Sequence, residues 1–263
     1  REALKYARER QQFGKAIIEF PAIRELLANM KAKLQGSRAM LYETTRFVEI
    51  YKDLTHISHD RKLTPEERAE MKAYTRLADA FTPMLKLMSS EYCNSLAYDA
   101  IQIFGGSGYM KDYPIERIYR DARITNIYEG TSQLQVVAAI RHVTTGTYLA
   151  QIKEYEAQTY EQKHLHEKLV ALREQYEQSV QKVVSAENNE FIDFHARRMV
   201  EMAAHIIISY LLMRQAGEVE DYRNSTELYV KYAEAQNSAA ARYIESSTLA
   251  DLDLISAVKE EEL

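Results

Sequence analysis

The sequence contains few of the residues that interrupt helices. Only four of its 263 residues are proline and eight are glycine, and most of the glycines lie between residues 105 and 146. Scarcity of both residue types predicts long, uninterrupted helices. No alternation of polar and apolar residues is long enough to indicate a strand. The expected fold class is therefore all-α: an antiparallel helical bundle at residues 1–146, followed by a second helical segment at residues 147–263.

Cysteine and excess charge are also scarce. The single cysteine, Cys93, excludes an internal disulfide and a multi-cysteine metal site, and its place in an apolar helical pattern predicts an inert core residue. The net charge of −5 offers no general attraction to nucleic acid or anionic lipid. The most apolar run, "AAHIIISYLLM" at 203–213, is too short for a membrane span. We expect no nucleic-acid partner, no membrane span and, from the cysteine usage, a cytoplasmic protein.

Histidine does not predict a metal site in this chain. The stretches "HISH" at 56–59 and "HLH" at 164–166 bring pairs of imidazoles together. A third ligand with suitable spacing is missing near either pair, and a metal needs more than two protein ligands. We therefore expect no metal.

Capping signals and helical apolar spacing divide the chain into helices. "TPEE" at 64–67 combines a cap, a first-turn proline and a capping-box glutamate, and "TP" at 82–83 predicts a second break. The polar stretch "HISHDRKL" predicts a loop. The expected helices lie at about 21–51, 64–82, 83–104, 132–146, 150–186, 189–216 and 221–249, with a short helix or tight coil at "IERIYRDAR".

Residues 105–133 differ from the rest in being rich in glycine, arginine and amide side chains. In "QIFGGSGY", Gln102 stands one turn before Gly105 and Gly106. Adjacent glycines let a ligand approach the backbone and expose N–H groups to an anion such as a phosphate. A helix C-cap with no ligand explains the same residues and is the simpler interpretation.

A lone acid, Glu129, stands in "NIYEGTSQ". A carboxylate in an apolar, water-poor pocket has a raised pKa and becomes a usable base near neutral pH. A surface acid is the simpler interpretation when Glu129 is considered alone. Near the start of the chain, "ERQQFGK" combines Arg10, Gln12 and Phe13, which together suit a phosphate and a flat ring; a helix end anchored by Phe13 is the alternative.

These three stretches, in this order, resemble the acyl-CoA dehydrogenases, in their C-terminal helical domain. "YARERQQFGKAI" is similar to the family pattern YxxxRxQFGxxI, and the stretch from "AYDAIQIFGG" to "YEGTSQLQ" is similar to the family signature. The resemblance covers residues 1 to about 146 and implies a four-helix bundle with a truncated start. Residues 147–263 would be a helical extension used for packing or dimer contacts.

The resemblance implies a role for each candidate residue. Glu129 would remove the α-proton of a fatty acyl-CoA thioester while the β-hydrogen leaves as hydride to FAD, giving a trans-2-enoyl-CoA. Tyr128 would line the acyl pocket and Gly130 would leave room for the thioester. The residues implied to bind FAD are Arg10, Gln12, Phe13, Gln102, Gly105, Gly106, Thr131 and Gln133.

The resemblance also implies partners and leaves alternatives open. FAD would be shared with a neighbouring subunit, which implies a homodimer or homotetramer, and the electron acceptor would be an electron-transferring flavoprotein. The family's N-terminal and middle β-domains are missing, so we expect the fragment alone to bind FAD poorly and to be inactive. An acyl-CoA oxidase of the same superfamily and a non-catalytic helical scaffold remain as alternatives.

Overall fold

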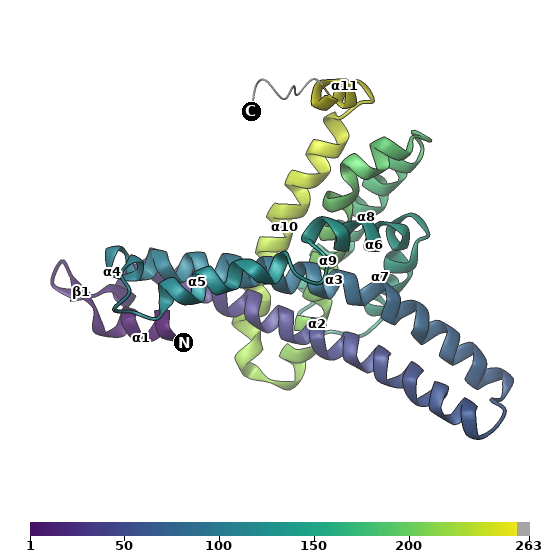
Figure 1. Ribbon diagram of the computed structural model, residues 1–263, viewed down its shortest axis with the longest axis horizontal. Helices are drawn as coiled ribbons and strands as arrows, with labels where there is room; N and C mark the ends of the chain where they lie inside the picture. Colours follow the sequence, from purple (N-terminus) through teal and green to yellow (C-terminus); the bar gives the residue numbers. More distant parts are fainter. Residues whose placement is uncertain (257–263) are drawn as a thin grey trace.

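The computed structural model describes residues 1–256, and Figure 1 shows that helices dominate it. The expected all-α class is confirmed. Two strands of two residues each, paired antiparallel, were not predicted. Among the described residues, every helix is too short or too polar to span a membrane.

The elements in order are α1 (Glu2–Glu9), β1 (Gln11–Gln12), β2 (Lys15–Ala16), η1 (Ile17–Glu19), α2 (Pro21–Asp60), α3 (Pro65–Phe104), α4 (Gly106–Tyr109), α5 (Ile115–Arg123), η2 (Ile124–Asn126), α6 (Ser132–Thr144), α7 (Thr147–Glu156), α8 (Lys163–Val184), α9 (Asn189–Glu218), η3 (Glu220–Tyr222), α10 (Arg223–Ser246) and α11 (Ala250–Ser256).

Helices α2 and α3 form a long antiparallel pair whose closed end extends beyond the other helices (Figure 1). The capping box predicted for α3 is present: the Thr64 hydroxyl accepts from the Glu67 N–H at 3.1 Å, and the Glu67 carboxylate accepts from the Thr64 N–H at 2.8 Å. The loop expected at "HISHDRKL" is too long, because α2 continues to Asp60. Buried Leu54 packs the last turns of α2 against the rest of the structure, and most of the polar side chains that follow it lie on the solvated face of α2.

The break expected at residues 82–83 is wrong, because α3 runs through Pro83 without interruption. Proline inside a helix removes one backbone hydrogen bond. Here Pro83 is buried between Phe81 and Met84, neither of which exposes any surface. Packing of this stretch into the core keeps the helix continuous despite the missing N–H.

Helix α9 is the centre of the molecule. Every residue from Met202 to Met213 is buried, and α9 packs against α2, α6, α8 and α10. Its contact with α2 is close at Gly36, where an added Cβ would lie 2.7 Å from Ile208 Cγ2. The absence of a side chain at Gly36 therefore allows α9, in the second helical segment, to pack closely against α2.

A buried carboxylate joins the same two parts of the chain. Glu43 of α2 is 2% exposed and accepts hydrogen bonds from Arg46 at 2.9 Å, from Arg214 of α9 at 2.8 Å and from the Tyr155 hydroxyl of α7 at 2.8 Å. Burial alone would raise the pKa of Glu43, but these three donors and the positive charge of Arg214 lower it to about 2. The cluster is ionised at neutral pH and stabilises the junction of α2, α7 and α9.

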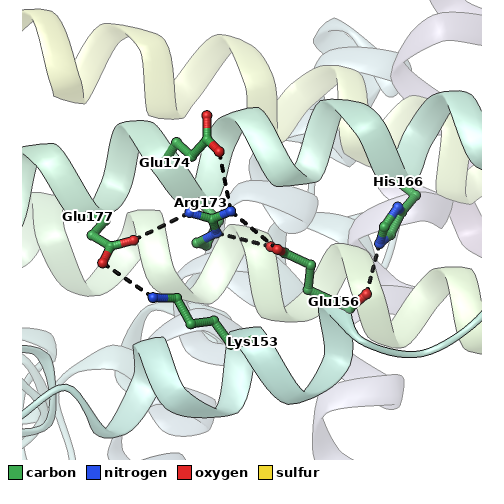
Figure 2. A network of polar contacts seen from close by, with 6 residues as sticks. All are labelled: Lys153, Glu156, His166, Arg173, Glu174 and Glu177. Atoms are coloured by element: carbon green, nitrogen blue, oxygen red, sulfur yellow. Dashed lines mark hydrogen bonds and ion pairs between the residues drawn. The ribbon is translucent and has the colours of Figure 1, made fainter.

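The single helix expected at 150–186 is two helices, α7 and α8, separated by a turn at residues 157–162. Figure 2 shows the contacts that stabilise the turn. Arg173 of α8 donates to both carboxylate oxygens of Glu156, at 3.0 and 3.2 Å, and a ring nitrogen of His166 lies 2.9 Å from the Glu156 carbonyl. Bidentate arginine–carboxylate pairs are strong and geometrically specific. This pair therefore compensates for the helical hydrogen bonds that are lost at the turn.

A smaller core positions the start of the chain. Ala3 and Ala7 of α1 pack with Ile103 and Phe104 at the end of α3, and the ring of Tyr6 stacks on Phe104 with 4.1 Å between centroids. The short β1–β2 hairpin follows α1 directly and is therefore held beside the glycine-rich end of α3.

Candidate functional site

A groove brings together six of the residues singled out by sequence. It has a volume of about 570 Å³ and lies between α1, the β1–β2 hairpin, the start of α2 and the end of α3. Gln12 and Phe13 come from the hairpin, and Gly105 marks the end of α3. The six residues are Arg10, Gln12, Phe13, Gln102, Gly105 and Gly106.

The groove offers an unused cation, amides and an aromatic ring. The guanidinium of Arg10 is exposed and forms no hydrogen bond or ion pair with any residue in the described part of the chain. Phe13 is 91% exposed, at a positive φ of 52°, which is unusual for a non-glycine residue and holds the ring away from the core. Gly105 has a φ of 61°, and a Cβ there would meet nothing within 4 Å. This combination suits a ligand that carries phosphate and a flat ring.

A second group of singled-out residues lies in the connection between η2 and α6. Glu129 is exposed and has a φ of 52°, and Gly130 follows with a φ of 94°. A Cβ on Gly130 would lie 2.7 Å from the side-chain amide nitrogen of Gln135, so only glycine fits without displacing that amide. The Gln135 amide donates to the carbonyls of Glu129 at 3.2 Å and of Gly130 at 3.3 Å. The carboxylate of Glu129 is thus presented to solvent on a tightly bonded turn.

The remaining residues of this group have distinct positions. The Thr131 hydroxyl caps α6 by accepting from the Leu134 N–H at 3.3 Å, which leaves its own hydrogen available as a donor. Gln133 is exposed, and within residues 1–256 its side chain forms no hydrogen bond. Tyr128 is 49% exposed. Thr131, Gln133 and Tyr128 are therefore accessible from outside this chain.

Exposed apolar side chains flank the Glu129 turn in the sequence, two before it and two after it in α6. Each of them exposes between 43% and 58% of its area, which is high for residues of this type. Several exposed apolar side chains close together in the sequence are compatible with a site that another protein segment or a ligand covers. These side chains are Ile124, Ile127, Leu134 and Val137.

Sequence reasoning missed the polar residues of α3 that lie beneath this loop. Lys86 donates to the Thr125 carbonyl at 2.6 Å and to the Gly130 carbonyl at 3.2 Å. Glu91 accepts from the Ser132 hydroxyl and from the Asn126 amide. The available signal was the presence of these two charges in a stretch otherwise composed of apolar and small residues.

Two further expectations concern Cys93 and metals. Cys93 is exposed, so its assignment to the core is wrong; it lines an apolar groove of about 840 Å³ between α1, α2, α3 and α5. The helical spacing placed Cys93 on α3 but did not reveal that its side chain is exposed in this groove. His56 and His59 have ring centroids 6.2 Å apart, and no group of three metal-ligating residues occurs among residues 1–256.

Comparison with known proteins identifies the family. The family model described as "Acyl-CoA dehydrogenase, C-terminal domain" matches residues 1–144, which is more than half of the chain, and the model "Acyl-CoA dehydrogenase C terminal" matches residues 144–252. The chain belongs to the acyl-CoA dehydrogenase family.

Individual relatives match about half of the chain. The subunit CarC of the caffeyl-CoA reductase-Etf complex of Acetobacterium woodii is 38% identical over 134 residues, which is 51% of this chain and 29% of that protein. An acyl-CoA dehydrogenase of Bacillus subtilis is 35% identical over 145 residues, which is 55% of this chain and 32% of that protein. The chain thus spans about a third of the length of these relatives.

A solved structure shares the fold over nearly the whole chain. The acyl-CoA dehydrogenase of Bacillus anthracis, crystallised with FAD, superposes with a TM-score of 0.68 over 92% of this chain and 45% of that protein, at 22% identity. The second helical segment is therefore part of a known arrangement.

Proposed function

We propose that this chain is the C-terminal part of a flavoprotein that dehydrogenates fatty acyl-CoA thioesters to trans-2-enoyl-CoA. Glu129 is the base that takes the α-proton, and FAD is the hydride acceptor. The observation that carries the proposal is the position of Glu129: its exposed carboxylate projects from a tightly bonded turn of unusual backbone conformation, flanked in the sequence by exposed apolar side chains.

The backbone at Glu129 supports an acid–base role. The α-proton of a thioester is removed easily only when hydrogen bonds stabilise the oxygen that becomes negative. The N–H of Glu129 has no hydrogen-bond partner among residues 1–256, so it is available to the thioester carbonyl beside the carboxylate that takes the proton. Gly130 leaves the adjacent space free of a side chain, and Tyr128 offers a ring against which an acyl chain packs.

The residues of the 570 Å³ groove fit part of FAD. The Arg10 guanidinium suits the pyrophosphate, and the exposed ring of Phe13 suits a flat heterocycle. Gln12, Gln102, Gly105 and Gly106 supply amides and open backbone, while the Thr131 hydroxyl and Gln133 amide are free to donate at the second site. When bound, FAD supplies the two-electron acceptor that no side chain provides.

Partners and assembly follow from the same proposal. Because the groove and the Glu129 loop are both exposed, we propose that a neighbouring subunit holds most of the FAD, in a homodimer or homotetramer. We also propose that an electron-transferring flavoprotein reoxidises the flavin; the CarC relative carries such a flavoprotein in its name. Residues 147–263 are proposed to be a separate helical extension that packs on the bundle of residues 1–146.

Anaerobic reduction of the flavin tests the proposed function. Full-length protein is mixed with saturated acyl-CoAs of increasing chain length, and the flavin absorbance is followed. We expect bleaching by one range of chain lengths in the wild type and none with Glu129→Gln. Glu154→Gln is the matched control, because Glu154 is exposed on α7 and has no ion pair within residues 1–256.

Each result has a defined meaning. Equal bleaching in wild type and Glu129→Gln would place the base elsewhere, and a protein bleached by no thioester would contradict the proposed reaction. For the isolated chain we expect no turnover and weak FAD binding, so tight stoichiometric binding in isothermal titration would contradict that part of the proposal.

A further inference from the structure

Two charged side chains of α3 lie directly beneath the Glu129 loop, one at each side. We propose that Lys86 and Glu91 are positioning residues for Glu129, and that Arg197 of α9 links this support to the second helical segment, an inference that rests on the proposed role of Glu129. None of the three residues is part of the groove or of the turn identified from the sequence.

Lys86 joins the two ends of the loop. Its ammonium donates to the carbonyl of Thr125 at 2.6 Å and to the carbonyl of Gly130 at 3.2 Å, so a single charge fixes both ends of a six-residue segment. Hydrogen bonds from a charged donor are shorter and stronger than neutral ones. The same ammonium lies 5.3 Å from the centroid of the Tyr128 ring, within the range of a cation–π contact.

Glu91 holds the loop from the side of α6. One carboxylate oxygen accepts from the hydroxyl of Ser132, the buried first residue of α6, and lies 3.4 Å from the amide nitrogen of Asn126 in η2. These two residues flank the Glu129 turn in the sequence. Glu91 therefore fixes the distance between the element that precedes the turn and the element that follows it.

The backbone of the turn needs such support. A positive φ at a non-glycine residue such as Glu129 is uncommon and persists only when the surroundings hold it. The contacts on either side come from Lys86 and Glu91, and Gln135 bonds the turn itself. Removing either α3 charge gives the turn freedom to relax, and the carboxylate of Glu129 then loses its direction.

The second helical segment reaches this loop through Glu91. Its other carboxylate oxygen lies 3.5 Å from Nη2 of Arg197. The Nε–H of the same guanidinium donates to Glu201, one turn further along α9, at 2.8 Å. Arg197 keeps the Glu91 carboxylate oriented toward Ser132 and Asn126. The helical extension thereby gains a role in the site beyond packing.

The test compares variants of the full-length flavoprotein. Lys86→Met and Glu91→Gln keep side-chain size and remove charge, Lys86→Arg restores a donor cation, and Arg197→Gln breaks the link to α9. Glu234→Gln is the control, since it removes an exposed ion pair with Lys168 between α8 and α10. The readouts are the flavin-reduction rate at saturating acyl-CoA, the acyl-CoA Kd, FAD content, and hydrogen exchange of residues 124–135.

We expect Lys86→Met to reduce the saturated rate by about 10²-fold, the loss typical of a reacting group displaced by about 1 Å. Glu91→Gln should lose less, Arg197→Gln least, and Lys86→Arg should recover most of the rate. The Kd and FAD content should change far less than the rate, because none of the three residues is among those proposed to bind acyl-CoA or FAD. Exchange of residues 124–135 should quicken in the same order, and Glu234→Gln should alter nothing.

Several results would overturn the inference. Faster exchange with an unchanged rate would mean that the support has no bearing on the reaction. Loss of rate only in proportion to lost FAD or lost folded protein would show a purely structural role. A wild type that no thioester reduces would remove the proposed function itself, and is distinguished from the other results because it appears before any variant is made.

Discussion

The Glu43 cluster and the Glu129 loop each centre on one glutamate, yet they differ in almost every other respect. Glu43 is 2% exposed, and three donors from three helices satisfy it within the chain. Glu129 is exposed, and its carboxylate has no partner among residues 1–256. The difference shows two uses of the same residue type: a satisfied buried charge stabilises a junction of helices, whereas an exposed one on a constrained turn is available to another molecule.

The same contrast extends to the surroundings. Residues around Glu43 and along α9 are packed so closely that Gly36 has no space for a methyl group. Residues around Glu129 and Phe13 leave apolar area uncovered. Substitutions in the first region should therefore change the free energy of unfolding, and substitutions in the second should change binding or turnover.

The largest effect on stability is expected from Glu43→Ala. Removing the carboxylate costs at most about 3–5 kcal/mol, because the buried Tyr155 hydroxyl and the partly exposed Arg46 and Arg214 all lose their acceptor. Urea denaturation measures this loss. Glu49→Ala, at an exposed position of the same helix, should cost far less; equal losses would mean that the cluster contributes nothing specific.

A smaller effect is expected from Gly36→Ala. Overpacking costs about 1–3 kcal/mol, since the new Cβ would lie 2.7 Å from Ile208 Cγ2 and would push α9 away from α2. The control is Gly217→Ala near the end of α9, where a Cβ meets nothing within 4 Å and a small gain is expected. Thermal unfolding of both variants decides whether the contact is as close as described.

A third effect depends on pH and also belongs to the packed region. His195 is fully buried, and neither ring nitrogen has a hydrogen-bond partner among residues 1–256. Burial, assisted by the charges of Arg198 and Lys182, lowers the pKa of His195 to about 4. The unfolded chain therefore takes up this proton first as pH falls.

The sign of that effect follows directly. Stability contributed by neutral His195 is complete above pH 6.5 and is lost progressively between pH 6.5 and 4. His195→Phe should flatten the decline of unfolding free energy over this window, as measured by urea titrations at several pH values. An unchanged slope would show that other groups cause the decline.

The smallest stability effect is expected from Gly130→Ala, which instead should abolish most activity. The φ of 94° and the contact with the Gln135 amide make alanine unfavourable by about 1–2 kcal/mol. The same change disturbs the turn that carries Glu129. A full-length variant that retains its Tm within a few degrees but loses flavin reduction would support an effect on activity, in contrast to the effect of Gly36→Ala on stability. A variant that unfolds would contradict this distinction between the two glycines.

The sequence predicted correctly several features that depend only on residues close together in the chain. The capping box at Thr64 and Glu67, the glycine stop at Gly105 and the start of α6 at Ser132 all depend on neighbouring residues in the chain. The family patterns allowed Arg10, Gln12 and Phe13 to be grouped with Gln102, Gly105 and Gly106, which the structure places in one groove. The roles of these residues and of Glu129 remain predictions.

The wrong predictions concerned features that depend on how the helices pack. The break at residues 82–83 was predicted because Thr82 and Pro83 match a helix start signal, but burial of the surrounding face keeps α3 intact. Cys93 was placed in the core because its spacing is helical, but its side chain is exposed in a groove between α1, α2, α3 and α5. Spacing shows which residues share a face; it does not show what lies opposite.

By itself, the sequence determined that this protein is helical, that its glycines and its unusual loop residues lie in a few places, and that it resembles one family. Those properties depend on composition and on neighbours within a turn or two. Only the tertiary structure decided that Lys86 and Glu91 support the Glu129 turn and that Arg197, about a hundred positions further along the chain, reaches the same network. Such contacts depend on how α3 and α9 pack, and packing joins residues whose separation in sequence carries no local signal.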